Sequence, residues 1–214
     1  MRLILALSVI ASTASADPPK PPAHYAKLFE KDRVLVYDLV HTYPDYEKAQ
    51  RQNLDDKPVT RWPRITERSV IKCKVTRVVT FSASIASQVE CDVEAMPMVP
   101  YVGGVFLANA AGLYRIGEIP ANEADLPKGD DLGSLEIPAT PKVARTAVPQ
   151  PNNDGKGVSG VRQSGGSWCS YGELTGASHG HNGSSYTCFG RGAISEIYVL
   201  DDSYKLRDWK IRAR

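Results

Sequence analysis

The chain has 214 residues, with 26 basic and 24 acidic side chains, so its formal net charge is only +2. Both signs are mixed along the sequence, which argues against a nucleic-acid-binding protein or a protein that binds an anionic membrane by charge. No apolar stretch after residue 16 approaches the roughly 20 residues that a transmembrane helix needs. The length suffices for one moderate hydrophobic core or two small ones.

Residues 1–16, MRLILALSVIASTASA, have the three parts of a secretory signal peptide. Arg2 supplies a positive start, residues 3–11 are apolar, and Ala-Ser-Ala precedes a cleavage point after Ala16. The apolar run is too short for a membrane anchor, and no cysteine adjoins the cleavage point for lipid attachment. The sequence therefore predicts a secreted or periplasmic protein; the alternative is a buried N-terminal helix.

Residues 17–30 begin with DPPKPPA and predict a Pro-rich leader ahead of the folded body. An N-terminal β region is expected over residues 31–119. It starts with a strand at 31–41, followed by a polar excursion in which residues 46–54 can form a short helix. A hairpin is expected at its end, turning at residues 109–112.

The centre of this region predicts a disulfide-linked hairpin. Four cysteines in an exported chain indicate two disulfides, although their number allows three connectivities. Apolar residues alternate with polar ones on both sides of Ser82, as in half-buried strands. Folding the chain there pairs Cys73 with Cys91, and also places Val79 opposite Ile85.

Residues 120–157 hold six prolines and few large apolar side chains, so they predict a linker or an extended crossing. A C-terminal β region follows at 158–214. The expected fold is mostly β, with antiparallel sheets built from hairpins and two disulfides. It forms either one β-rich domain or two small β halves.

A second disulfide-linked hairpin is expected in the C-terminal region. Placing Cys169 opposite Cys188 brings aromatic side chains together on both faces of the hairpin. The aromatic pairs are Tyr171 with Tyr186 and Trp168 with Phe189.

The tip of this hairpin carries the candidate metal ligands. His179 and His181 flank a glycine, and Glu173 precedes them. Imidazole and carboxylate groups bind zinc, but this spacing matches no known ligand motif, and the Asn-Gly that follows is typical of a turn. A solvated hairpin tip is the favoured interpretation. Searches for nucleophile, phosphate-binding and dinucleotide motifs give no catalytic residue and no cofactor.

The C-terminal residues 205–214 alternate basic side chains around Trp209. One interpretation is contact with an anionic polymer of the cell envelope. The favoured one is a terminal edge strand or helix with solvated charges, because acidic residues such as Asp208 dilute the basic ones.

The order LFEKDRVLVYDLV, VGGVFLANAAGLYRIGEIP, then WC…YTCF-GRG resembles a family of uncharacterised exported proteins and lipoproteins of environmental bacteria. Its members are similar in a late W-C…Y-x-x-C-F…G-x-G hairpin after a Pro-rich break. This chain departs from them in lacking a lipobox cysteine and in its shorter C-F-G-R-G. The resemblance implies no activity, so no functional residue is carried over.

We therefore expect a non-enzymatic exported envelope protein that binds a small ligand or a partner protein on its sheet or hairpin loops. One alternative is a hydrolase or metal-dependent enzyme that uses the loop of His179 and His181. The other is a structural or assembly component. No nucleic-acid partner is expected.

Overall fold

The structure is a computed structural model that describes residues 20–54, 56–57, 61–92, 102–148, 156–175, 183–201 and 207–214. The predicted signal peptide and the two histidines of the hairpin tip lie outside these residues. The strands in the described part are β1 (Val34–Pro44), β2 (Arg64–Thr80), β3 (Ser84–Asp92), β4 (Gly104–Asn109), β5 (Gly112–Ile116), β6 (Ser134–Pro138), β7 (Ala144–Val148), β8 (Lys156–Ser164), β9 (Ser167–Thr175), β10 (Gly183–Gly190), β11 (Ala193–Asp201) and β12 (Arg207–Ala213). The helical segments are η1 (Ala26–Phe29), α1 (Tyr46–Arg51), η4 (Glu123–Asp125) and η5 (Gly129–Leu132).

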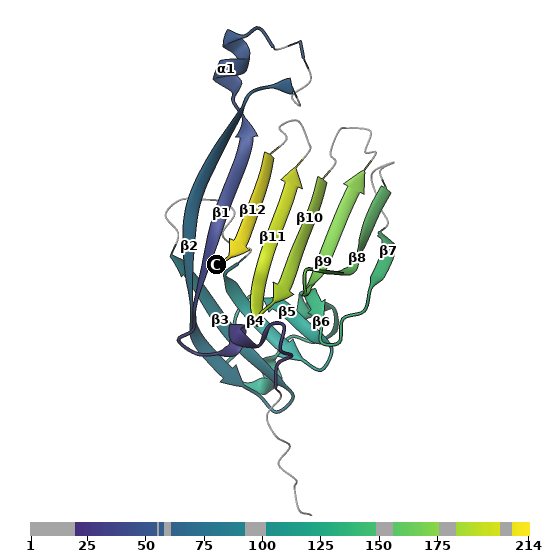
Figure 1. Cartoon of the computed structure of the whole chain (residues 1–214). Coiled ribbons are helices and arrows are strands. Elements are labelled where there is room, and N and C mark those ends of the chain that lie inside the picture. Colours follow the sequence, from purple (N-terminus) through teal and green to yellow (C-terminus); the bar gives the residue numbers. More distant parts are fainter. Residues whose placement is uncertain are drawn as a thin grey trace, which may run out of the picture.

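All twelve of these strands belong to one antiparallel sheet, which confirms the predicted β fold. Their order is β6-β5-β4-β3-β2-β1-β12-β11-β10-β9-β8-β7. Both disulfide-linked hairpins are therefore part of the same sheet. In Figure 1, β1 and β12 to β7 form the front layer, and β3 to β6 cross behind its lower part. The long β2, at the left edge of the picture, joins the two layers by pairing with β1 and β3.

The connection between β6 and β7 requires the sheet to curl. These strands are its two edges, and a flat sheet of this width would separate them by roughly 50 Å at a strand spacing of about 4.8 Å. Only residues 139–143 join them, a segment that spans at most about 20 Å when extended. The predicted linker thus contains both edge strands of the sheet and fixes its curvature.

The main hydrophobic core fills the inside of this curl, on what we call the inner face of the sheet. Buried side chains come from both layers, among them Leu39 of β1, Phe106 of β4 and Phe189 of β10. The segment after the predicted leader prolines contributes Tyr25 and Leu28, both fully buried, so η1 is part of the body (Figure 1).

A smaller apolar cluster lies on the opposite, outer face of β3, β4 and β5. It contains Ala86, Leu107 and Ile116, with Leu126 and Leu132 packed against it. The segment with η4 and η5 therefore covers this part of the outer face.

The first hairpin has the predicted disulfide between Cys73 and Cys91. Its register shifts between Val75 and Arg77, so Val79 lies opposite Ala86 instead of Ile85. A β-bulge inserts one residue in β2 and reverses the alternation beyond it. The predicted pairing of Val79 with Ile85 is therefore wrong, and Val79 packs with the outer cluster.

The second hairpin follows the predicted register throughout. Cys169 is bonded to Cys188, and the two predicted aromatic pairs lie in register. The inner face carries Phe189 and Trp168 against the main core, so the disulfide and the tyrosine pair lie on the outer face.

The basic C-terminal segment is not an edge strand. Instead, β12 lies in the middle of the sheet, hydrogen-bonded to β1 and β11. Ile211 is buried in the main core, so the neighbouring Lys210 and Arg212 belong to the outer face. In the described part of the chain, no helix is long and apolar enough to cross a membrane.

Candidate functional site

The predicted metal-binding residues are only partly described. Glu173 is an exposed residue of β9, between Ser184 of β10 and Val158 of β8. His179 and His181 lie outside the described residues. Among the residues that are described, no group of three or more His, Cys, Asp or Glu side chains could hold a metal ion.

The two other histidines, His24 and His41, make contacts that connect elements of the fold. His24 bonds the backbone of Pro138; burial lowers its pKa more than this bond raises it. The ring of His41 stacks on Trp209 at a centroid distance of 5.0 Å, and its Nδ1 lies 3.6 Å from Glu67 Oε2. These contacts tie the segment before η1 to β6, and they tie β1 to β12 and β2.

A groove of about 590 Å³ lies at the end of the sheet where β10 turns into β11. It is lined by β1, β12, β11, the end of β10 and the turn from β8 to β9. One acidic side chain, Glu196, lines it together with five basic ones: Lys27, Arg33, Arg191, Arg212 and Arg214. We call it the basic groove.

A tight turn places Arg191 at the rim of the basic groove. Arg191 and Gly192 both have positive φ, 55° and 94°, which suits the two-residue hairpin between β10 and β11. Gly192 also accepts a hydrogen bond from the backbone N–H of Lys27 at 2.7 Å. A Cβ at Gly192 would lie 2.7 Å from Lys27 Cγ, so this turn brings the two cations together only with glycine there.

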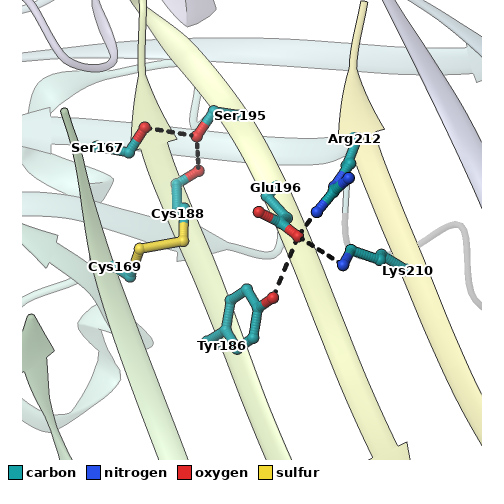
Figure 2. Close-up of polar contacts among 8 residues, drawn as sticks. All are labelled: Ser167, Cys169, Tyr186, Cys188, Ser195, Glu196, Lys210 and Arg212. Carbon is teal, nitrogen blue, oxygen red and sulfur yellow. Dashed lines mark hydrogen bonds and ion pairs between the residues drawn. A yellow bond between two sulfur atoms is a disulfide. The ribbon is translucent and has the colours of Figure 1, made fainter. Parts of the chain in front are cut away.

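A β-bulge brings Ser195 and Glu196 to the same face. The register of β10 and β11 shifts between Cys188 and Phe189, which leaves an extra residue in β11. Ser195 Oγ lies 3.2 Å from the carbonyl oxygen of Cys188 and 3.0 Å from Ser167 Oγ (Figure 2). Neither hydroxyl bonds a basic group in the described part of the chain, so the pair anchors β9 to β11.

Glu196 is the centre of a polar network on the outer face (Figure 2). One carboxylate oxygen, Oε1, accepts hydrogen bonds at 3.1 Å from Tyr186 Oη and Arg212 Nε, and lies 3.4 Å from Lys210 Nζ. Burial raises the pKa of Glu196, but these hydrogen bonds and the charges of Arg212 and Lys210 outweigh it, so the pKa is lowered. Glu196 is therefore an anion that orients its two basic neighbours.

The ion pairs leave donor groups of the arginines available. Arg212 uses Nε towards Glu196, and Arg214 donates from Nε and Nη2 to Asp38 Oδ1 at 2.8 and 2.6 Å. Arg33 lies 3.6 Å from Glu30. Within the described residues, Lys27 and Arg191 have no acidic partner within 4 Å, so their charges face solvent and the groove. Chemically, this is a set of donors for carboxylate or phosphate oxygens.

The sequence contains only part of the signal for this groove. The basic tail supplies Arg212 and Arg214, which line the groove; the interpretation of this tail as a polymer contact stays a prediction. Lys27, Arg33 and Arg191 come from two distant turns, and no local pattern joins them to the tail. Two glycines at the β10–β11 turn are the one visible hint of a tight hairpin there.

No protein-family model matches the chain, and a search of curated proteins finds no match.

Proposed function

We propose that this chain is an exported, non-enzymatic binding module that holds an anionic ligand in the basic groove. The observation that supports it most is the concentration of five cations around about 590 Å³ in a chain whose net charge is only +2. Lys27 and Arg191 have no acidic partner within 4 Å among the described residues. Like charges brought together on folding cost free energy, so an anionic ligand that neutralises these two gains by binding.

The arrangement of the donors suits binding. Asp38 and Glu196 hold the Nε sides of Arg214 and Arg212, which restricts both side chains while their remaining N–H groups can donate to a ligand. Preorganised guanidinium groups lose less side-chain entropy when they bind an oxyanion. The two disulfides fit a secreted or periplasmic location, in agreement with the proposed signal peptide.

Calorimetric titration of the full chain with citrate at low ionic strength tests the proposal. We expect saturable binding that weakens with added salt, and a loss of about tenfold or more in Arg191→Glu and in Lys27→Glu. Arg145→Glu is the matched control, because Arg145 is exposed on β7 and outside the groove. Absence of saturable binding to citrate, or an equal loss in the control, would overturn the proposal.

A further inference from the structure

A second groove of about 450 Å³ continues the basic groove across the outer face. It lies over β2, β1 and β12 and is lined by four basic side chains: Arg68, Lys210, Arg212 and Arg214. Arg212 and Arg214 line both grooves, so the two form one continuous surface with seven distinct cations. We call the second one the neighbouring groove.

The combined surface is too long for a ligand with a single charged group. It crosses six adjacent strands, from β2 through β1, β12, β11 and β10 to β9. Five strand spacings of about 4.8 Å give a length of about 24 Å. The cations of this surface extend from Arg68 on β2 to Arg191 at the β10–β11 turn, so a ligand that contacts all of them must be an extended chain with repeated negative charges.

The acidic residues inside the surface indicate which other groups the ligand has besides its negative charges. Asp38 lies in the neighbouring groove and Glu196 in the basic groove. Each uses one carboxylate oxygen for its arginine, and the second oxygen accepts no hydrogen bond from a described residue. These oxygens are open to solvent, and hydroxyl groups that lie between the anionic groups of a ligand can donate to them in place of water. A densely charged polyphosphate or nucleic acid would instead bring negative charge against both carboxylates.

The backbone of this region argues against an acidic peptide. The neighbouring groove lies on the face of the sheet, and each strand from β2 to β9 is hydrogen-bonded on both sides, so this region has no open sheet edge. An extended peptide needs partners for its own N–H and C=O groups, which an open sheet edge supplies and a sheet face does not. Apolar side chains, among them Val70 with 44% of its surface exposed, offer flat contact between the charges.

We infer that the outer face from β2 to β9 binds an acidic polysaccharide, a chain of sugar units that carry carboxylates and hydroxyl groups. This inference rests on the proposed function, because it assigns a ligand class to the basic groove and extends it. The guanidinium groups bind the carboxylates, and the free oxygens of Asp38 and Glu196 accept sugar hydroxyl groups.

The test measures the affinity of the full protein chain for galacturonate and for its oligomers of two to six units. We expect affinity to rise by about tenfold or more between the monomer and the longest oligomer. Arg68→Glu, which changes only the neighbouring groove, should weaken the hexamer by about tenfold and leave citrate within about twofold. Arg191→Glu should weaken both ligands, and Arg145→Glu neither.

Three outcomes would overturn the inference. If affinity does not depend on chain length, or if Arg68→Glu has no effect on the hexamer, the extended site is wrong. If the extended site is wrong but Arg191→Glu still weakens citrate binding, the proposed function stands without the extended site. If citrate also fails to bind, the proposed function and the further inference are both wrong. If oligoglutamate of matched charge binds as tightly as the hexamer, the assignment to polysaccharide is wrong.

Discussion

The two disulfide-linked hairpins are alike in sequence but opposite in their place on the sheet. Cys73 and Cys91 are 18 residues apart, and Cys169 and Cys188 are 19 apart. The first disulfide packs into the main core on the inner face, whereas the second lies on the outer face, where Cys188 lines the basic groove. The same stabilising device thus supports the core in one hairpin and the candidate site in the other.

The sharpest test of this comparison replaces each cysteine pair by alanine. Closing loops of such similar length gives each disulfide about 3 kcal/mol on the chain-entropy model. Both double variants should cost more than that, because each also leaves a void beside a buried cysteine: Cys73 is 2% exposed and Cys169 is 0% exposed. Chemical unfolding of both variants measures these costs.

The anion titration then separates the roles of the two disulfides. The titration is done without denaturant, at a pH and temperature where both variants are folded. Under these conditions the variant Cys169→Ala with Cys188→Ala should bind citrate more weakly than the unchanged protein. The pair at positions 73 and 91 should leave citrate binding unchanged. Equal losses of citrate binding would mean that the second disulfide has no special place in the site.

Two glycines beside the hairpins allow a finer comparison. A Cβ at Gly103 would lie 2.9 Å from Cys91 Sγ and 3.1 Å from the carbonyl oxygen of Val89. A Cβ at Gly190 would overlap Ser167, whose Cβ is 3.0 Å away. We expect about 1–3 kcal/mol of destabilisation in each alanine variant, larger for Gly103 because a disulfide and a backbone oxygen cannot move as a serine can.

A second substitution checks the cause at Gly190. Removing the Ser167 side chain in Gly190→Ala with Ser167→Gly should recover part of the lost free energy of unfolding, since the overlap disappears. No recovery relative to Ser167→Gly alone would contradict the packing explanation.

Buried tyrosines on the inner face predict sensitivity to alkali. Burial raises the pKa of Tyr25 to about 12 from its usual 10.0. The folded protein therefore keeps Tyr25 neutral where the unfolded chain already ionises, so this contribution to stability is present below pH 10 and is lost as the pH rises towards 12. Tyr25→Phe should reduce the slope of stability against pH in that window, with a change of about 1 kcal/mol or less at neutral pH.

The matched variant on the outer face is Tyr186→Phe. Burial and the charge of Glu196 raise the pKa of Tyr186 as well, but Phe also removes its hydrogen bond to Glu196. Stability measured by thermal unfolding at neutral pH should therefore fall in Tyr186→Phe more than in Tyr25→Phe. A larger loss of stability in Tyr25→Phe would mean that the hydroxyl group of Tyr25 in the core stabilises the protein more than that of Tyr186.

The sequence predicts what depends on alternation within a hairpin and misses what depends on irregular residues. Both disulfides and the full register of the second hairpin follow from period-two patterns. The bulge after Val75 and the bulge that places Ser195 beside Glu196 have no such signal, because an extra residue reverses the pattern without leaving one. The pairing of β1 with β12 joins the two ends of the chain, and local periodicity does not determine such distant partners. For the same reason the cations of the basic groove could not be grouped beforehand.

The smallest expected effect belongs to Glu196, the acid of the polar network. Its pKa is lowered from 4.5, so its ion pairs stabilise the folded state above pH 4.5 and are lost as the pH falls below that value. Glu196→Gln should flatten this acid limb, with a cost at neutral pH of about 1 kcal/mol or less because the network is partly solvated. Glu90→Gln in the first hairpin is the matched control, since Glu90 has no basic partner within 4 Å among the described residues and bonds only Gln88. Thermal unfolding of both variants between neutral pH and pH 3 shows whether ionisation of Glu196 is coupled to folding. If the two variants lose stability equally as the pH falls, Glu196 orients Arg212 without stabilising the sheet.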